Sequence, residues 1–301
     1  MRVICIALGV AIGFAVSGCG SRSGQDAGIL AFASYRDGES AIYTVQVDGS
    51  DITRVTSNPE RISKPNWSAD GSRLVVVLTD NDRHNLDIYS MNFDGSGQQR
   101  LTSVEWVDTD PAWAPDGEKI AFSSARDSFV TELDGLINEY EIYVMNADGS
   151  GKMNLTNALG WDTAPAWSPS GNRIAFQSDR DGNAEIYVMD SNGMNQVNLS
   201  NHPANDAAPA WSPDGTQIAF QSDRSGSYEI YVIDAAGSVV TQLTDSPERD
   251  YAPDWSPDGR RIAFQTRRDG NFEVYVMKAD GTDPVRVTMH GDFDGFPDWR
   301  P

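Results

Sequence analysis

The sequence predicts an all-β protein, a six-bladed β-propeller of four-stranded antiparallel blades, from three observations. A tryptophan that follows a proline by two residues recurs at spacings of 46, 54, 44, 44 and 44, as Trp67, Trp113, Trp167, Trp211, Trp255 and Trp299. After each of the first five come two apolar runs separated by polar turns. No stretch shows the helical period of about 3.6 residues. Repeats of about 44 residues with four short strands each are typical of propeller blades.

The unit that begins at Pro165 shows the expected elements of one blade. It reads PAWSPSGNRIAFQSDRDGNAEIYVMDSNGMNQVNLS. PAWS is a short first strand with proline at its start, where the missing N–H is harmless, and SPSG is a tight turn with glycine available for positive φ. RIAFQS and EIYVM are rich in β-branched and aromatic residues and form the second and third strands. QVNLS, after the turn DSNG, is the fourth.

The two ends of the repeat region complement each other. LAFASYRDGESAIYTV, from Leu30, aligns with IAFQSDRDGNAEIYVM, from Ile174, so the N-terminal end enters at the second strand of a unit. Trp299 lies in a first strand that has no second strand after it. We therefore expect residues 29–301 to form one domain whose sixth blade combines one C-terminal strand with three N-terminal strands. Such closure removes the exposed edges of an open array.

The segment before this region is typical of an export signal. Arg2 gives a short positive region, VICIALGVAIGFAV is an apolar run of fourteen residues, and VSGC ends at Cys19. A membrane-spanning helix needs about 20 apolar residues, so we interpret 1–18 as a cleaved signal peptide. VSGC resembles the lipobox of bacterial lipoproteins, which implies lipidation of Cys19 and a flexible tether over 19–28. An ordinary secretory signal is the alternative.

Composition restricts the function further. Both cysteines, Cys5 and Cys19, precede the repeats, which excludes disulfides, thiolate metal sites and a cysteine nucleophile from the folded region. The chain has 44 acidic and 23 basic side chains, a formal net charge of −21. This argues against nucleic acid as a partner and suits solubility or a cationic partner. We expect a monomer that contacts the membrane only through its N-terminal lipid.

One known family has a similar repeat. WSPDGTQIAFQSDRSGSYEIYVI, from Trp211, resembles the repeat of TolB-type propellers, the WD40-like or PD40 repeat, without the Gly-His and Trp-Asp signatures of true WD40 blades. The resemblance covers roughly residues 29–301 and implies an adaptor in envelope complexes, on the periplasmic or cell-surface side. TolB carries an α/β domain before its propeller. We expect that domain to be missing here, since the repeats begin about ten residues after Cys19.

Two charged positions recur in register with the tryptophans. Three residues before the proline lie Asp108, Asp162, Asp206, Asp250 and Asp294, and thirteen residues after the tryptophan lie Arg126, Arg180, Arg224 and Arg268, with Arg36 aligned for the closing blade. The unit of Trp67 departs at both positions, with Ile62 and Asp80, and also carries Arg61, Lys64 and Asp82 as if the charges were exchanged. We expect each aspartate to pair with the arginine of its own blade. A carboxylate ring for cations is the alternative.

The less regular residues at the expected channel mouth are the candidates for binding. Loops that lead into the first strands gather at one mouth of a propeller. The candidates are Asp250, Asp254, Asp294, Asp298, Trp106, Trp161, Tyr251 and Phe293. Carboxylates beside exposed rings suit a peptide with Lys or Arg and equally a sugar. The alternative is that each ring packs between blades.

An insertion and several acidic turns are further candidate sites. SFVTELDGLIN, in the unit of Trp113, is expected to project over the same mouth as a recognition element. We expect no cofactor. The turns SDRDGN and DFDG lack the full ligand pattern of a calcium loop, and calcium binding there is the alternative. His84, His202 and His290 lie in different loops, so no histidine metal site is predicted.

These features predict a non-catalytic binding or adaptor protein of the bacterial cell envelope. Its acidic, aromatic channel mouth would hold a protein, peptide or glycan. One alternative is a carbohydrate-active enzyme, a lyase or glycosidase, although the sequence has no Gly-x-Ser-x-Gly motif and a fold alone implies no chemistry. The other alternative is a structural assembly module without a dedicated ligand.

Overall fold

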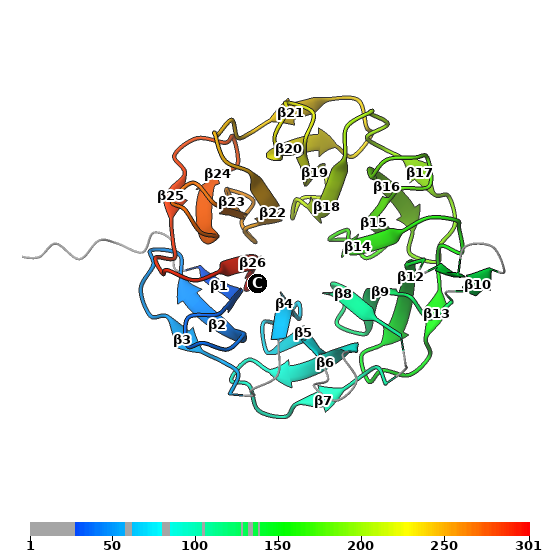
Figure 1. The fold of residues 1–301 in the computed structure, drawn as a ribbon, viewed down its shortest axis with the longest axis horizontal. Helices are drawn as coiled ribbons and strands as arrows, with labels where there is room; N and C mark the ends of the chain where they lie inside the picture. The colour runs from blue at the N-terminus through cyan, green and yellow to red at the C-terminus, as the bar shows by residue number, and fades with distance from the viewer. Residues whose placement is uncertain are drawn as a thin grey trace, which may run out of the picture.

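The structure is a computed structural model that describes residues 28–57, 62–79, 85–103, 106–127, 129–131, 135–137 and 139–301. These residues form six four-stranded antiparallel sheets arranged radially around a central channel (Figure 1). The predicted all-β, six-bladed propeller is therefore confirmed. The expected signal peptide, Cys19 and all but the last residue of the tether lie outside the described residues. Within these ranges, no helix has the length and apolar character needed to cross a membrane.

We number the blades 1 to 6 and give their strands from the channel outward. Blade 1 contains β4 (Ile62–Trp67), β5 (Arg73–Thr79), β6 (Leu86–Asn92) and β7 (Gln99–Arg100). Blade 2 contains β8 (Asp108–Trp113), β9 (Lys119–Ser124), β12 (Glu141–Asn146) and β13 (Met153–Asn154). Blade 3 contains β14 (Asp162–Trp167), β15 (Arg173–Ser178), β16 (Glu185–Asp190) and β17 (Val197–Asn198). Blade 4 contains β18 (Asp206–Trp211), β19 (Gln217–Ser222), β20 (Glu229–Asp234) and β21 (Val240–Gln242). Blade 5 contains β22 (Asp250–Trp255), β23 (Arg261–Thr266), β24 (Glu273–Lys278) and β25 (Val285–Arg286). Blade 6 contains β26 (Asp294–Trp299), β1 (Ile29–Ser34), β2 (Ala41–Gln46) and β3 (Thr53–Arg54).

Blade 6 closes the ring with strands from both ends of the repeat region. The inner strand β26 pairs antiparallel with β1, so that Trp299 lies opposite Leu30 and Asp294 opposite Ser34. In Figure 1 the red β26 lies beside the blue β1. The predicted combination of one C-terminal and three N-terminal strands is confirmed. Because β1 pairs with β2 on one side and with β26 on the other, neither edge of β1 is left unpaired.

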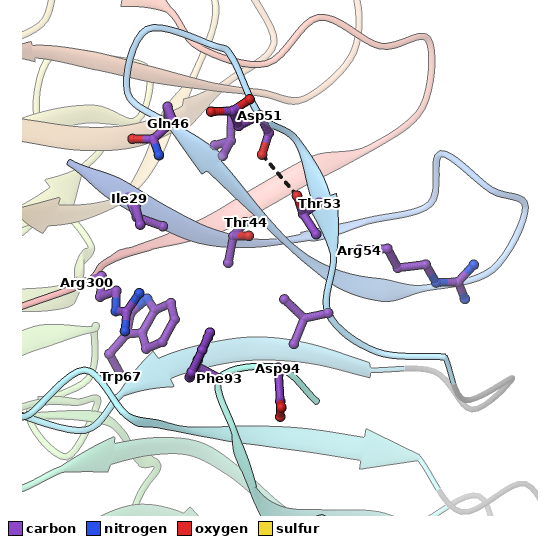
Figure 2. Close-up of a pocket in the computed structure, with 12 residues that line it drawn as sticks. Ile29, Thr44, Gln46, Asp51, Thr53, Arg54, Trp67, Phe93, Asp94 and Arg300 are labelled. Atoms are coloured by element: carbon purple, nitrogen blue, oxygen red, sulfur yellow. Dashed lines mark hydrogen bonds between the residues drawn. The ribbon is translucent and has the colours of Figure 1, made fainter. Parts of the chain in front are cut away.

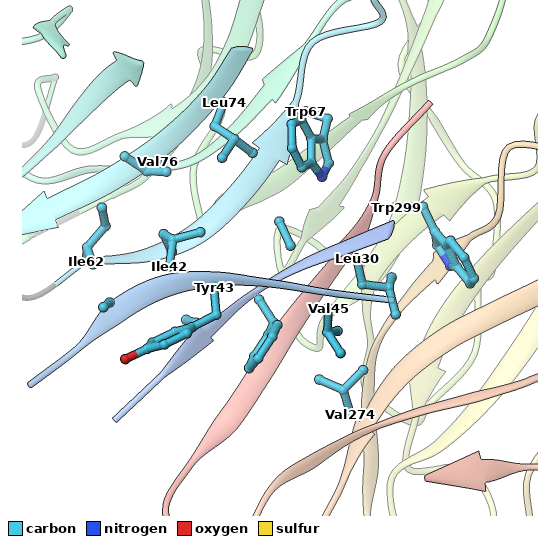
Figure 3. Packing of buried hydrophobic residues seen from close by; sticks show 14 of the residues in the cluster. Leu30, Ile42, Tyr43, Val45, Ile62, Trp67, Leu74, Val76, Val274 and Trp299 are labelled. Carbon is cyan, nitrogen blue, oxygen red and sulfur yellow. The ribbon is translucent and has the colours of Figure 1, made fainter. Parts of the chain in front are cut away.

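Neighbouring blades pack face to face through the recurring apolar side chains. Successive side chains of a strand face opposite sides of the sheet, so each blade buries one face against each neighbour. Figure 3 shows this between blades 6 and 1, where Ile42 and Leu30 lie near Leu74 and Trp67. The phenylalanine of the second strand is fully buried in five blades, as Phe32, Phe122, Phe176, Phe220 and Phe264. The AF and IYV patterns of the repeat thus form the core between blades.

Each inner strand contains a bulge that shapes the channel wall. The residue before the proline has φ between 45° and 55° in all six: 49° at Lys64, 51° at Asp110, 52° at Ala164, 51° at Ala208, 48° at Ala252 and 54° at Phe296. The pairing register to the second strand shifts at the same place, for example between Thr163 and Ala166. A bulge re-aims the side chains around it. As a result, the residue before and the residue after each proline both line the channel.

The insertion of blade 2 forms a hairpin, β10 (Phe129–Thr131) paired with β11 (Gly135–Ile137). In Figure 1 β10 lies at the outer rim of the disc, beyond β12 and away from the central channel. The expectation that the insertion projects over the channel mouth is wrong for this hairpin backbone. The insertion joins β9 to β12, and both strands lie outside the inner strand β8 in blade 2.

Candidate functional site

The recurring aspartates and arginines form ion pairs within blades 2 to 6. Arginine Nη2 lies close to a carboxylate oxygen in each: Arg126–Asp108 3.0 Å, Arg180–Asp162 2.6 Å, Arg224–Asp206 2.6 Å, Arg268–Asp250 3.0 Å and Arg36–Asp294 2.7 Å. The five aspartates are fully buried at the start of the inner strands. Each arginine also stacks on the phenylalanine and tyrosine of the second and third strands, as Arg224 does on Phe220 and Tyr231 at 5.2 and 5.0 Å. These groups fix the start of the inner strand to the adjacent turn.

Two of the binding candidates belong to these pairs. The side chains of Asp250 and Asp294 are fully buried, and neither lines the channel cavity described below. Burial raises the pKa of Asp294, and the hydrogen bond of Ser34 and the charge of Arg36 oppose that shift. A ligand at the mouth therefore has no access to either carboxylate. Both carboxylates belong to the ion pairs within their own blades.

In blade 1 the described member of the expected charge exchange is Lys64, which contacts the next blade. Lys64 donates a hydrogen bond to Asp110 of blade 2. Asp110 also accepts from Ser123 Oγ at 3.2 Å, and Lys64 Nζ lies 5.8 Å from the ring centre of Phe296 in blade 6. This group joins three blades at the channel wall. Arg61, Asp80 and Asp82 lie outside the described residues.

The central channel contains a cavity of ≈ 760 Å³ lined by all six inner strands. We call the end at which these strands begin the mouth. The residues after the prolines form one ring of the wall: Asn66, Ala112, Ala166, Ala210, Asp254 and Asp298. The residues before the prolines form a second ring nearer the mouth, and Tyr140, Trp161 and Tyr251 lie above them. Of the binding candidates, Asp254, Asp298, Trp161 and Tyr251 line this cavity.

The polar members of the first ring hold the next blade. Asp254 Oδ2 accepts the main-chain N–H of Trp299 at 2.7 Å, Asp298 Oδ2 that of Trp67 at 2.7 Å, and Asn66 Oδ1 that of Trp113 at 2.8 Å. Asn66 Nδ2 also donates to Asp298 Oδ1 at 2.9 Å. Burial raises the pKa of Asp254 to about 7. Burial, and then the nearby charge of Asp254, raise the pKa of Asp298.

The alanine half of the ring leaves the equivalent amides without a cap. Along a strand the N–H groups alternate in direction, and Ser212 N–H donates to Gln217 O at 2.9 Å, so Trp211 N–H points away from β19. Ala166 stands where Asn66 caps Trp113, and Ala112 precedes Trp167 in the same way. In the described part of the chain, neither Trp167 N–H nor Trp211 N–H has an acceptor. Both residues line the cavity.

Aromatic rings surround the mouth in two groups. Tyr140 and Trp161 touch at 5.8 Å between ring centres, and Trp161 is 51% exposed. The second group, which we call the aromatic rim, runs through blades 4 to 6 with neighbouring ring centres 5.2 to 5.9 Å apart: Tyr228, Tyr251, Phe272, Phe293, Phe296 and Tyr35. Phe293 thus belongs to the rim rather than to the cavity wall. Trp106 is half-buried and does not line the cavity.

A second, smaller cavity of ≈ 380 Å³ lies at the far end of β4, between blades 6 and 1. Figure 2 shows Arg300 beside Trp67 and Phe93 in it. The guanidinium carbon of Arg300 lies 5.0 Å from the Trp67 ring and 4.9 Å from the Phe93 ring. Arg300 Nε also donates to Gly71 O at 3.0 Å. These contacts fasten the end of β26 to blade 1.

No group of three or more His, Cys, Asp or Glu side chains in the described ranges is placed to hold a metal ion. Binding of calcium at the acidic turns stays a prediction. Sequence reasoning missed Asn66, Asp110 and Tyr140, all of which line the cavity. A signal existed for Asn66, because it stands at the position where other units have alanine or aspartate.

The chain is similar to TolB proteins in sequence and fold. It is 29% identical to a TolB homologue of Chlorobium luteolum over 154 residues, which make up 51% of this chain and 32% of that protein, so the chain spans about a third of that curated relative. TolB from Acinetobacter baumannii superposes with a TM-score of 0.79 at 24% identity, covering 92% of this chain and 68% of that one. A putative TolB from Agrobacterium tumefaciens gives 0.71 at 23% identity, over 89% and 90%.

The same fold also occurs in a different context. A chain of hydrazine synthase from Kuenenia stuttgartiensis has a TM-score of 0.74 at 16% identity, over 92% of this chain and 47% of that one. At such identities the solved structures show a shared fold alone. The family model of the TolB β-propeller domain, PD40, matches residues 21–130, 128–202 and 195–301. The chain therefore belongs to the TolB β-propeller domain (PD40) family.

Proposed function

We propose that this protein is a non-catalytic binding protein of the bacterial cell envelope that holds a segment of a protein partner in the channel mouth. The observation that carries the proposal is the ≈ 760 Å³ cavity between the six inner strands. Binding sites are typically concave and largely apolar with a few placed polar groups. Tyrosine and tryptophan, which line this cavity, are also among the residues that dominate protein–protein contacts. The export-type N-terminal sequence supports a location outside the cytoplasm.

The way the channel uses its polar side chains supports binding over catalysis. Asp254 and Asp298 accept main-chain N–H groups of the following blade, and Lys64 and Asp110 pair with each other. Each of these groups thereby holds blades together. A general acid or base must instead be free to reach the reacting atom of a substrate.

A carbohydrate-active enzyme is the second candidate function, and one observation favours it. Asp254 and Asp298 line the same cavity, and burial raises the pKa of Asp254 to about 7, as a general acid requires. The decisive assay is turnover of polysaccharides by the wild type and by Asp254→Asn. Turnover that the substitution abolishes would replace the binding proposal.

The binding proposal is tested by affinity capture from an envelope extract with residues 19–301 as bait. Trp161→Ala removes an exposed ring from the cavity wall, and Phe93→Ala is the matched control because Phe93 is 48% exposed at the opposite end of the channel. We expect a partner that the wild type and Phe93→Ala retain and Trp161→Ala loses. Equal retention by all three would contradict the proposal.

A further inference from the structure

Two exposed hydrogen-bond donors lie at the mouth without a carboxylate partner in the described part of the chain. Arg249 and Arg267 are exposed, and neither has a carboxylate partner among the described residues. Arg249 Nη1 lies 3.4 Å from Tyr251 Oη, and the guanidinium carbon of Arg267 lies 5.3 Å from the Phe272 ring centre. The two arginines therefore flank neighbouring members of the aromatic rim. Trp167 and Trp211 add two uncapped N–H groups in the cavity below.

Several carboxylates near the same surface are already engaged. Asp223, the carboxylate whose charge acts on Arg249, accepts Asn205 N–H at 2.8 Å and Asn205 Nδ2 at 3.0 Å. Asp250 and Asp294 pair with arginines, and Asp110 pairs with Lys64.

We propose that the mouth binds a polypeptide segment through its carboxylate side chains and main-chain carbonyl oxygens. The carboxylates lie at Arg249 and Arg267, and carbonyl oxygens of the segment accept from Trp167 and Trp211 N–H in the cavity. An exposed guanidinium on an aromatic ring is preorganised for a carboxylate. An extended segment presents carbonyl groups at regular intervals to the free amides. This inference rests on the proposed function and specifies the chemistry of its partner.

Asp254 and Asp298 on the cavity wall oppose an anionic segment, as do the exposed Asp245, Glu248 and Asp292 in the loops at the mouth. Both oxygens of Asp298 and one of Asp254 already accept hydrogen bonds from neighbouring blades. Burial raises the pKa of both side chains, which lowers the charge they carry near neutral pH. They stand on the wall of blades 5 and 6, whereas Trp167 and Trp211, the residues with uncapped amides that line the cavity, belong to blades 3 and 4.

The test uses an array of random synthetic peptides, each made in versions that carry Glu, Gln or Lys at the same positions. Binding of the purified propeller is compared with that of Arg249→Gln/Arg267→Gln. Arg260→Gln, an exposed arginine on a turn beyond the far end of β22, is the matched control. We expect the Glu versions to bind best, and the double variant to lose about tenfold in affinity per arginine. Arg260→Gln should behave as the wild type.

A second variant tests the cavity amides. Ala166→Asn copies the cap that Asn66 provides and supplies an acceptor for Trp211 N–H. It should weaken binding of all peptide versions while the melting temperature stays equal or rises, which a merely disruptive substitution would not do.

The outcomes separate the two proposals. Preference for the Lys or Gln versions, or a Glu preference that survives in the double variant, overturns the anionic partner and leaves the binding function. Unchanged peptide binding by a folded Ala166→Asn overturns the role of the amides. If no peptide version binds the wild type better than Trp161→Ala, both the anionic partner and the peptide-binding function fail. Binding to immobilised glycans alone in that case identifies a glycan receptor.

Discussion

The carboxylate of Asp298 accepts a hydrogen bond from the main-chain N–H of Trp67 at 2.7 Å, although 231 positions separate the two residues. Asp298 lies on β26 and Trp67 ends β4, so the bond crosses the junction at which the ring closes. Asn66 continues the contact, since it donates to Asp298 and accepts from Trp113 of blade 2. Side chains that line the ligand cavity thus also fasten the ring.

Asp298→Ala should destabilise the fold by about 1–3 kcal/mol. It leaves the donors of Trp67 and Asn66 without their acceptor, and an unsatisfied buried donor costs about that much. Urea denaturation measures the free energy of unfolding. Asp292→Ala is the control from the same region, because its exposed side chain should contribute within about 0.5 kcal/mol. Equal stabilities of the two variants would show that the cap is unimportant.

The ion pair of blade 4 should reveal itself in a double-mutant cycle. Arg224→Ala leaves the fully buried Asp206 uncompensated, at a cost of about 3–5 kcal/mol. Asp206→Ala/Arg224→Ala should be less destabilised than the sum of the single variants. A charge swap is a weaker test, because it also removes the stacking of Arg224 on Phe220 and Tyr231. Additive losses in the cycle would mean that the pair is not coupled.

The stability of the fold should fall as the pH rises from about 5 to about 8. Burial raises the pKa of Glu141 and of Asp254 to about 7, and raises that of Asp298. A group with a raised pKa in the folded state contributes stability that is fully present below its unfolded pKa, near 4, and is lost as the pH passes the folded value. We expect a loss of at least about 1 kcal/mol in the free energy of unfolding over this range.

Surface carboxylates act in the other direction at lower pH. The hydrogen bonds of Ser68 and Ser72 lower the pKa of Asp70 to about 2, so its contribution is present above pH of about 4 and disappears below it. Maximum stability should therefore lie near pH 5. Glu141→Gln should flatten the alkaline side of the profile. A wild-type profile that rises from pH 5 to pH 8 is the result that rejects this assignment.

Removal of β26 should abolish the cooperative unfolding of the ring. Deletion of residues 293–301 removes the inner strand of blade 6, the partner of Arg36 and the cap of Trp67. Calorimetry should show no single sharp transition. Deletion of Arg300 and Pro301 alone removes the contacts to Trp67 and Gly71 and should lower the melting temperature modestly. A truncated protein that melts like the full chain would rule out this form of closure.

The sequence allowed the blades and their ring closure to be predicted because each element repeats. Trp299 without a following strand and Leu30 without a preceding one are local patterns, and antiparallel pairing leaves one arrangement for them. The pairing of Asp206 with Arg224 was also visible as a joint recurrence. Signals of this kind depend only on neighbours within one unit.

The cavity could not be predicted, because it depends on contacts between units. Asp254 and Asp298 were expected to make the channel mouth acidic for a ligand, but they follow the positive-φ residue of their strands by two positions and accept main-chain N–H groups of the next blade. Lys64 reaches Asp110, 46 residues later in blade 2, a contact between units that the repeat does not reveal. The repeat pattern of a sequence does not reveal where side chains point around a residue with positive φ.

The central claim is that the channel mouth is the surface a partner occupies. Its most direct test is photo-crosslinking in living cells, with a benzophenone amino acid at position 161 in the cavity or at position 93 at the opposite end. We expect position 161 to yield a discrete crosslinked species that Tyr251→Ala diminishes, and position 93 to yield none. Crosslinking from position 93 alone, or equally from both, would contradict the claim.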